Sequence, residues 1–353
     1  MLLRLVFFVP TCGLPTITNH APLPCARSPC LNTRAPRLQS RSQQAPPPHT
    51  TMAFSRCSCS LLVALLLLLS LLAVGSLAAT GPGDIAVFWG RNKDEGTLRE
   101  ACDTGAYTAV LISFLTGFGG AANKSYSLDL SGHPLAGVGD DIKHCQSKGI
   151  LVLLSIGGPA GNNANYSLPT PRSAAELASH LWDAYLGGSR PGVPRPFGDA
   201  ALDGVDFYID QQGGAGAGHY DELARRLSAH NRSYRGRPGV TLTATVRCAY
   251  PDPSLAAALA TGLFARVHVR LYGGDLRCEW GQFDSWNKWA AAYPGSRVFV
   301  GVVASPEADK DAYLFQKDLY YGILQFAEKV PNYGGLMIWD RYYDKINHYI
   351  SSS

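Results

Sequence analysis

Acidic residues are absent from the first 78 residues of the 353-residue chain, and so is lysine. This part contains six arginines, so its removal leaves 31 − 6 = 25 basic and 27 acidic residues, a formal charge of −2 instead of +4. The positive charge belongs to the leader, and we expect no nucleic-acid partner. The longest apolar run, residues 61–74, is shorter than the roughly 18 residues of a membrane-spanning helix, so we expect no membrane anchor.

The leader contains a secretory signal. Arg56 precedes the apolar run, and Ser76 and Ala78 follow it at the two positions that a signal peptidase reads. This pattern predicts a signal peptide over residues 52–78, starting at Met52, and a secreted, extracellular chain over residues 79–353. Residues 1–51 hold five arginines and many prolines and serines, and they fit either an organelle transit peptide or an extension that is rarely translated. We favour the extension, because a complete signal begins at Met52.

Four of the nine cysteines remain after the signal. An even set in a secreted chain predicts two disulfides, and the sequence alone allows three pairings. Three Asn-x-Ser sequons predict glycosylation sites. The cysteines are Cys102, Cys145, Cys248 and Cys278, and the sequons begin at Asn123, Asn165 and Asn231.

Short apolar segments alternate with helix-forming segments through the remaining 353 − 78 = 275 residues. Their near-continuous Val, Ile and Leu content is typical of parallel strands buried on both faces. Eight such units predict one (β/α)8 (TIM) barrel domain with two disulfides. An open doubly wound sheet is the alternative, but no glycine-rich phosphate loop follows any strand. We expect strands at 85–89, 109–114, 151–156, 205–209, 241–246, 267–272, 298–302 and 336–339, and helices at 174–186, 220–230 and 255–263.

The fourth expected strand carries a row of polar residues on one face. Residues 204, 206, 208 and 210 share that face, while Val205, Phe207 and Ile209 share the other. Barrel sites form at the carboxyl ends of the strands. We therefore expect a rim site built from Asp206, Tyr208, Asp210, Arg270, Tyr272 and Trp339.

The segment 203–210 resembles the D-G-x-D-x-D-x-E signature of family 18 glycoside hydrolases, the family of the plant class III chitinases. Within that family the chain most resembles the cereal xylanase inhibitor proteins. The resemblance implies the pairings Cys102–Cys145 and Cys248–Cys278, and a place in the plant apoplast. The family segments are VFWGRN (87–92), DEGTL (94–98), LSIGG (154–158), LDGVDF (202–207), YGGLMIW (333–339) and YYD (342–344). The inhibitor-like segments are GRNK (90–93), DDIKHCQSK (140–148), TATVRC (243–248), VHVR (267–270) and WDRY (339–342).

Two positions depart from the chitinase signature. The resemblance implies that a glutamate should stand at Asp210 as the general acid, and an aspartate at Tyr208 as its anionic partner. Asp210 is one methylene shorter, and a misplacement of about 1 Å can cost on the order of 10²-fold in rate. Tyr208 has an ordinary pKa of about 10 and supplies no anion. Arg270 stands where active relatives carry Gln, and contact with Asp210 would hold that carboxylate ionised. We therefore expect hydrolysis of chitin to be very weak or absent.

The remaining rim residues have several interpretations. Asp203 and Asp206 are interpreted as structural hydrogen-bonding groups. Tyr272 and Trp339 match the family's sugar-contacting residues, and ordinary barrel packing explains them equally well. The alternatives are therefore a weak chitinase that uses Asp210, or a lectin that binds chito-oligosaccharides through Tyr272 and Trp339.

The resemblance implies a protein partner instead of a substrate. A helix-borne lysine of the inhibitors enters the cleft of family 10 xylanases, and Lys317 matches it. A cation presented to two catalytic carboxylates is complementary in charge. In a second loop, an arginine enters family 11 xylanases, but Ser233 occupies that position. Arg232, Arg235 and Arg237 flank it, and the sequon at Asn231 lies in the same loop. We expect a monomer without cofactor or metal that inhibits microbial xylanases, family 10 more than family 11.

Overall fold

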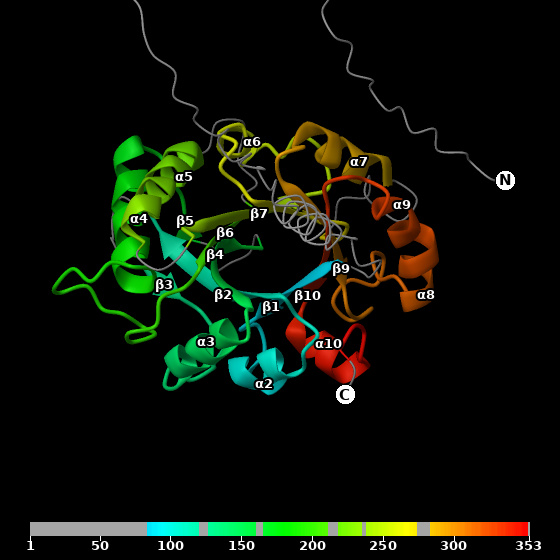
Figure 1. Ribbon diagram of the computed structural model, residues 1–353, viewed down its shortest axis with the longest axis horizontal. Coiled ribbons are helices and arrows are strands. Elements are labelled where there is room, and N and C mark those ends of the chain that lie inside the picture. Colours follow the sequence, from blue (N-terminus) through cyan, green and yellow to red (C-terminus); the bar gives the residue numbers. More distant parts are fainter. Residues whose placement is uncertain are drawn as a thin grey trace, which may run out of the picture. The chain divides into compact units, whose positions relative to one another are not determined.

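In the computed structural model, the described part of the chain folds into a closed barrel of eight parallel strands surrounded by helices (Figure 1). The structure describes residues 83–119, 126–159, 165–210, 218–234, 238–273 and 283–351. Pairing of β1 with both β2 and β10 closes the barrel. The barrel strands are β1 (Asp84–Trp89), β2 (Ala109–Phe118), β4 (Leu151–Gly158), β6 (Gly204–Ile209), β7 (Thr241–Arg247), β8 (Arg266–Arg270), β9 (Arg297–Val303) and β10 (Tyr333–Trp339). The predicted fold class is confirmed.

Helices follow the barrel strands in the alternating order that the sequence predicts. They are α2 (Leu98–Asp103), α3 (Val138–Ser147), α4 (Pro171–Tyr185), α5 (Tyr220–Ala229), α6 (Ala256–Leu259), α7 (Phe283–Ala292), α8 (Gln316–Asp318), α9 (Gln325–Ala327) and α10 (Arg341–Asn347). A π-helical segment, η5 (Leu319–Leu324), joins α8 to α9, and the short helices η2 (Lys93–Glu95) and η3 (His230–Ser233) lie in loops. Two short strands, β3 (Ser127–Leu128) and β5 (Asn165–Tyr166), pair with β2.

Local sequence signals explain where the long helix α4 begins. The Thr170 hydroxyl accepts a hydrogen bond from the Ser173 backbone N–H, and the Ser173 side chain accepts one from the Thr170 backbone. Pro171 occupies the first helical position, where its missing N–H costs no helical hydrogen bond. The helix expected at 255–263 was too long, since only Ala256–Leu259 is α-helical. The strand expected to reach Tyr272 ends at Arg270.

The core has two layers, as the alternation in β6 predicts. Val205, Phe207 and Ile209 pack in the layer between the barrel and its helices. Tyr208 lies in a separate cluster inside the barrel, with Phe88 and Phe114 among its members. The odd-numbered side chains of β6 therefore support the helices, while the even-numbered ones face the barrel interior.

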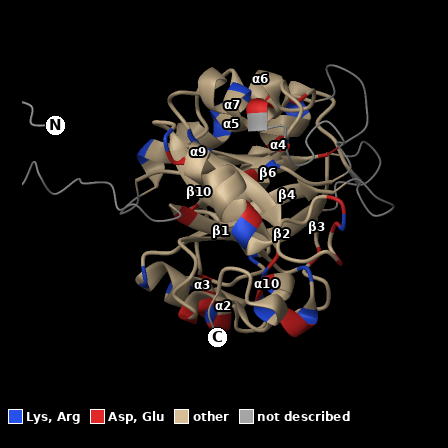
Figure 2. Ribbon diagram, turned by 90° about the vertical axis from the view of Figure 1, so that its right-hand side faces the viewer, with Lys and Arg blue, Asp and Glu red and all other residues tan. Residues whose placement is uncertain are grey.

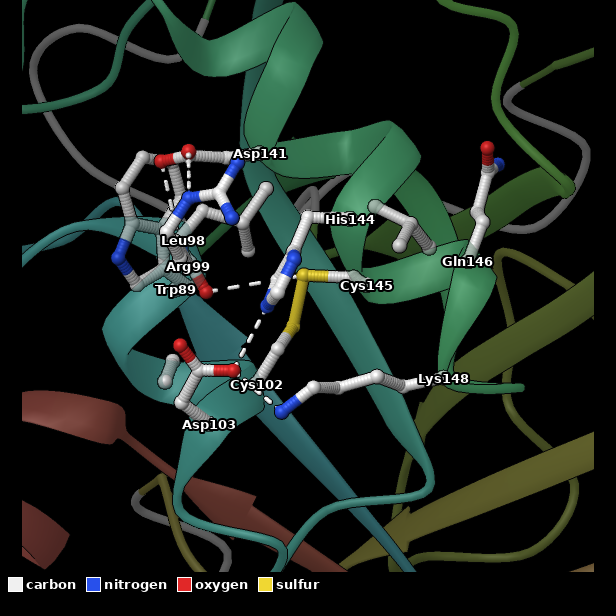
Figure 3. The surroundings of a disulfide bond; sticks show 12 residues. Trp89, Leu98, Arg99, Cys102, Asp103, Asp141, His144, Cys145, Gln146 and Lys148 are labelled. Atoms are coloured by element: carbon white, nitrogen blue, oxygen red, sulfur yellow. Dashed lines mark hydrogen bonds and ion pairs between the residues drawn. A yellow bond between two sulfur atoms is a disulfide. The ribbon is translucent and has the colours of Figure 1, made fainter.

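A disulfide between Cys102 and Cys145 ties α2 to α3 (Figure 3). Beside it, His144 Nε2 lies 2.7 Å from a carboxylate oxygen of Asp103, and Lys148 contacts the same carboxylate. These contacts, His144 first, lower the pKa of Asp103 to about 2. The first predicted pairing is confirmed. Cys248 is also disulfide-bonded, but Cys278 lies outside the described residues, so the second pairing stays a prediction.

Within the described ranges, no helix has both the length and the apolar content to cross a bilayer.

Candidate functional site: a barrel rim with a paired carboxylate

Asp206 lies inside the barrel and is completely buried. Its carboxylate accepts hydrogen bonds from Ser155 Oγ at 2.7 Å, from Thr243 Oγ1 at 2.6 Å and from Thr245 Oγ1 at 3.0 Å. These donors come from the strands on both sides of β6, because the register places residues 155 and 243 opposite Asp206. His268 Nδ1 lies 3.5 Å away. Each carboxylate oxygen is thus satisfied within the barrel, which offsets the cost of burying it.

Asp210 follows β6 at the carboxyl end of the barrel, where two arginines hold it. Arg270 Nη2 lies 3.3 Å from Asp210 Oδ1, and Arg247 makes a second ion pair with the same oxygen. Arg270 is buried, and the Arg247 side chain is about one-third exposed. The Asp210 backbone N–H donates to Tyr166 Oη at 3.0 Å. The carboxylate therefore accepts from two cationic donors, which come from the ends of β7 and β8.

Tyr208 occupies the other substituted position and is buried among aromatic side chains. Its ring lies 5.8 Å from Phe88, 5.3 Å from Phe114 and 6.1 Å from Trp339, between ring centroids. The hydroxyl accepts from Arg270 Nη1 at 2.6 Å, and that guanidinium also lies 4.3 Å above the ring. Burial raises the pKa of Tyr208 to about 12. The phenol is neutral and supplies no negative charge.

Tyr272 and Trp339 complete the rim as half-buried aromatic groups. Their ring centroids lie 6.2 Å apart, and Trp339 also packs 5.1 Å from Phe88. The Tyr272 hydroxyl contacts Met337 Sδ at 3.7 Å, and burial raises the pKa of Tyr272 well above its ordinary value. Both residues therefore take part in barrel packing, and their remaining exposure leaves room for contact with a ligand.

Asp203 lies at the amino end of β6, away from this rim. Its carboxylate accepts hydrogen bonds from the Val152 backbone N–H at 2.8 Å and from Gln146 Nε2 at 3.0 Å. It joins β4 and α3 to the start of β6, so its role is structural.

Sequence reasoning missed two features of the rim. The first is Arg247, which ends β7 next to Asp210; a basic residue at the end of the neighbouring strand was the available signal. The second is the acidic pair Glu95 and Asp340, which follow the first and last barrel strands. Glu95 Oε1 accepts from the backbone N–H of Gly90 at 2.8 Å, and its Oε2 has no hydrogen-bond partner among the described residues. Burial and Glu95 raise the pKa of Asp340 to about 7.

The expected partner-binding residues lie on the outside of the barrel. Lys317 is exposed in α8, and Arg232 and Ser233 are exposed in η3. Asn231 is exposed too, and its Oδ1 accepts from the Val240 backbone N–H at 2.8 Å. Asn165 begins β5. Arg235, Arg237 and Asn123 lie outside the described residues.

Across the ranges that the structure describes, no group of three or more His, Cys, Asp or Glu residues is arranged to hold a metal ion. The rim therefore offers ion-paired and aromatic groups to a ligand. Asp210 stands at the signature position of the proton donor, and Tyr208 stands at that of its anionic partner.

The fold and the rim define a barrel of the glycoside hydrolase type, and comparison with known proteins assigns the family. The family model described as "Glycosyl hydrolases family 18" matches residues 84–296 of the chain. The chain belongs to this family. The predicted family resemblance is confirmed.

Relatives of two kinds are similar over most of this chain. Xylanase inhibitor protein 2 of Oryza sativa subsp. japonica is 63% identical over 272 residues, which cover 77% of this chain and 90% of the rice protein. The acidic endochitinase Pun g 14 of Punica granatum is 40% identical over 307 residues, covering 83% of this chain and 95% of its own. Among solved structures, the xylanase and alpha-amylase inhibitor protein XAIP-II of Scadoxus multiflorus superimposes with a TM-score of 0.70 at 37% identity, covering 76% of this chain and 97% of that one.

Proposed function

We propose that the protein is a secreted inhibitor of microbial endo-1,4-β-xylanases, built on a family 18 barrel that does not hydrolyse chitin. The 63% identity to a rice xylanase inhibitor protein supports the inhibitory role. The rim supports the loss of hydrolysis, because Asp210 is paired with Arg247 and Arg270 and Tyr208 is a neutral phenol. A general acid must reach the glycosidic oxygen of the substrate, whereas the Asp210 carboxylate is held by two guanidinium groups.

The observation that carries the inhibitory role is a stretch of exposed aromatic side chains on both sides of Lys317 in the sequence, called here the aromatic face around Lys317. Phe315 and Tyr321 are each 67% exposed, Tyr320 is 52% exposed and Phe326 is 49% exposed. These four side chains lie within twelve residues of the chain, over α8, η5 and α9. Large apolar side chains gathered on a surface mark interaction sites in soluble proteins.

The surface joins cations to several aromatic rings: Lys317 lies in α8, and Lys329 Nζ lies 5.4 Å from the centre of the Phe326 ring. Figure 2 shows the helix that ends at α9 facing the viewer, with a long uncharged stretch. Residues 319–327 of that stretch contain no charged side chain. A xylanase cleft has catalytic carboxylates, which attract Lys317. The aromatic rings are the residue types that dominate binding energy in protein interfaces. We infer that this helix blocks the cleft of family 10 xylanases.

Inhibition of family 11 xylanases has weaker support. The matching loop position is Ser233, and its neighbour Arg232 is exposed in η3. Asn231 is exposed, so a glycan on it would stand next to Ser233. We infer that the protein inhibits family 10 xylanases more strongly than family 11 xylanases.

The proposal includes secretion after cleavage of residues 52–78, glycosylation at one or more of the three sequons, and a monomeric state in the plant apoplast. The weak chitinase and the chitin-binding lectin remain the alternative functions. The half-exposed Tyr272 and Trp339 favour the lectin over the chitinase, since they offer aromatic surface without an active acid.

The test is inhibition of one purified family 10 xylanase by the secreted protein. We expect Lys317→Ala to weaken inhibition at least about tenfold, the loss of one well-placed charge contact. Lys288→Ala is the matched control, since Lys288 is an exposed lysine on the neighbouring helix α7. Equal inhibition by the Lys317 and Lys288 variants would remove the assigned contact.

The same preparation separates the alternatives. Hydrolysis of chitin oligosaccharides that Asp210→Ala abolishes would establish the chitinase. Retention on chitin without turnover or inhibition, lost in Trp339→Ala, would establish the lectin.

A further inference from the structure

A cavity of about 520 Å³ lies on the outside of the barrel, between α4 and the loop that follows it. Its volume falls within the range of small-molecule sites. One wall is a single face of α4, whose residues recur at helical spacing, and the other is the segment 190–194. Figure 1 shows α4 and α8 on opposite sides of the barrel, so this cavity is separate from the aromatic face around Lys317. The lining residues that matter are Tyr126, Arg172, Glu176, His180, Arg190 and Val193.

The loop wall is preformed. Arg195 lies directly after the cavity segment and donates hydrogen bonds to five backbone carbonyls at 2.6–3.0 Å. The Arg195 guanidinium thus fixes this part of the loop both to the end of α4 and to the later loop residues 198 and 200. A wall that is fixed before binding costs little ordering entropy when a ligand enters. The acceptors belong to Asp183, Leu186, Gly188, Gly198 and Ala200.

Two stacked aromatic rings line the cavity. The Tyr126 and His180 rings lie 3.5 Å apart between centroids and only 6° from parallel. Burial lowers the pKa of His180 to about 4, so the imidazole is neutral at physiological pH. Its Nε2 has no hydrogen-bond partner among the described residues. The cavity therefore presents an uncharged aromatic surface to a ligand, while the His180 Nε2 atom itself is buried.

The charged side chains of the cavity cancel in pairs. Arg172 Nε lies 3.0 Å from Glu176 Oε1, and Arg190 Nε lies 3.3 Å from Asp183 Oδ2. An anionic ligand would meet Glu176, and a cationic one would meet two guanidinium groups. A neutral ligand with many hydroxyls suits both the carboxylate and the guanidinium groups, since a hydroxyl donates to a carboxylate and accepts from a guanidinium.

We propose that this cavity binds a neutral saccharide, with one pyranose ring against Tyr126 and its hydroxyls on Glu176, Arg172 and Arg190. The apolar C–H face of a sugar ring packs on an aromatic face, whose π-system is electron-rich. The volume suits one or two sugar rings. The saccharide is a free disaccharide or the end of a polysaccharide chain, and the proposal does not depend on xylanase inhibition.

The experiment maps binding on the secreted, isotope-labelled protein by NMR with xylobiose, maltose and N,N′-diacetylchitobiose. At least one is expected to shift signals of residues 171–180 and 190–194, with a dissociation constant of about 1 mM. Tyr126→Ala is expected to weaken saccharide binding about tenfold, and Glu176→Gln is expected to weaken it several-fold. Co-sedimentation with insoluble arabinoxylan, starch and chitin distinguishes a polymer end from a free sugar.

The matched control is Glu222→Gln on α5, which breaks a chemically similar pair because Arg226 Nε lies 2.7 Å from Glu222 Oε1. It should leave saccharide binding unchanged, and all three variants should keep their inhibition of xylanase. The proposal is overturned if no saccharide shifts these signals. It is equally overturned if the shifts centre on Tyr272 and Trp339 and survive Tyr126→Ala.

Discussion

Asp210 is one methylene shorter than the acid that the family signature requires, and its carboxylate is also paired with Arg247 and Arg270. Restoring the length by Asp210→Glu leaves Arg270 buried beside the carboxylate and Tyr208 neutral. We therefore predict that Asp210→Glu gains no measurable hydrolysis of chitin tetrasaccharide over the parent protein. A fluorogenic or chromatographic assay checks this. Turnover by the single variant would show that side-chain length alone silenced the site.

Protonation of Asp340, at the rim, makes the stability of the folded protein depend on pH. Burial and Glu95 raise its pKa to about 7, whereas an unfolded aspartate titrates near 4. The folded protein therefore binds a proton that the unfolded chain has already released, so stability decreases as pH rises from about 4 to about 7 and levels off above. The full effect is at most about 4 kcal/mol, three pKa units at 1.36 kcal/mol each.

We predict that Asp340→Asn flattens this decline. Asparagine keeps the helix cap in which Asp340 Oδ1 accepts from the Tyr343 backbone N–H at 3.2 Å, and it does not titrate. Thermal unfolding between pH 4 and pH 8 is the measurement. Parallel curves for parent and variant would mean that another group causes the pH dependence.

At the scale of elements, the disulfide is the covalent link between α2 and α3. The two cysteines are 43 residues apart, and closing a loop of that length in the unfolded chain accounts for about 4 kcal/mol of stability in the chain-entropy treatment. We predict that the double variant Cys102→Ser, Cys145→Ser loses about 2–4 kcal/mol in denaturant unfolding. Lys148→Ala, which removes a neighbouring exposed ion pair, should lose less than about 1 kcal/mol. Equal losses would show that the covalent link adds no stability.

The segment from α8 to α9 presents its aromatic rings to solvent, so removing one of these rings loses little packing in the free protein. Tyr321 is 67% exposed, so Tyr321→Ala should leave the unfolding temperature within about 1 °C. The same change should weaken inhibition of a family 10 xylanase about tenfold, because aromatic side chains dominate interface energetics. Tyr250→Ala, at an exposed tyrosine after β7, is the control. Unchanged inhibition by the Tyr321 variant would limit the contact to Lys317.

For the whole molecule, periodicity predicted the barrel because its strands are buried on both faces and therefore read as continuous apolar runs. The alternation in β6 placed Tyr208 and Val205 on opposite faces of the strand, and the two residues do lie in separate clusters. Helix length was predicted less well. The run of alanines after Leu255 has strong helical propensity, yet the helix ends at Leu259.

The site was predictable where residues share one strand or lie on strands of known order. Arg270 and Asp210 were both expected at the rim, and the structure brings them into contact at 3.3 Å. The contact of Arg247 with Asp210 was not predicted. The segment TATVRC (243–248) showed only a resemblance to the xylanase inhibitors and indicated no role for the arginine. Glu95 and Asp340 are 245 positions apart, and only closure of the barrel between β1 and β10 brings their strands together.

The proposed selectivity between xylanase families depends on two separate elements of the barrel, α8 and η3. Ser233 stands where relatives are inferred to carry an arginine, and it also completes the sequon of Asn231. Ser233→Ala removes only the glycan site and preserves the bond from Val240 to Asn231. Ser233→Arg removes the glycan site and adds a guanidinium suited to bidentate carboxylate binding. We predict that Ser233→Arg gains inhibition of a family 11 xylanase, that Ser233→Ala does not, and that both inhibit a family 10 xylanase as the parent does. Parallel inhibition assays on one enzyme of each family decide this. A gain by Ser233→Ala would identify the glycan as the barrier, and strong family 11 inhibition by the parent would contradict the proposed preference.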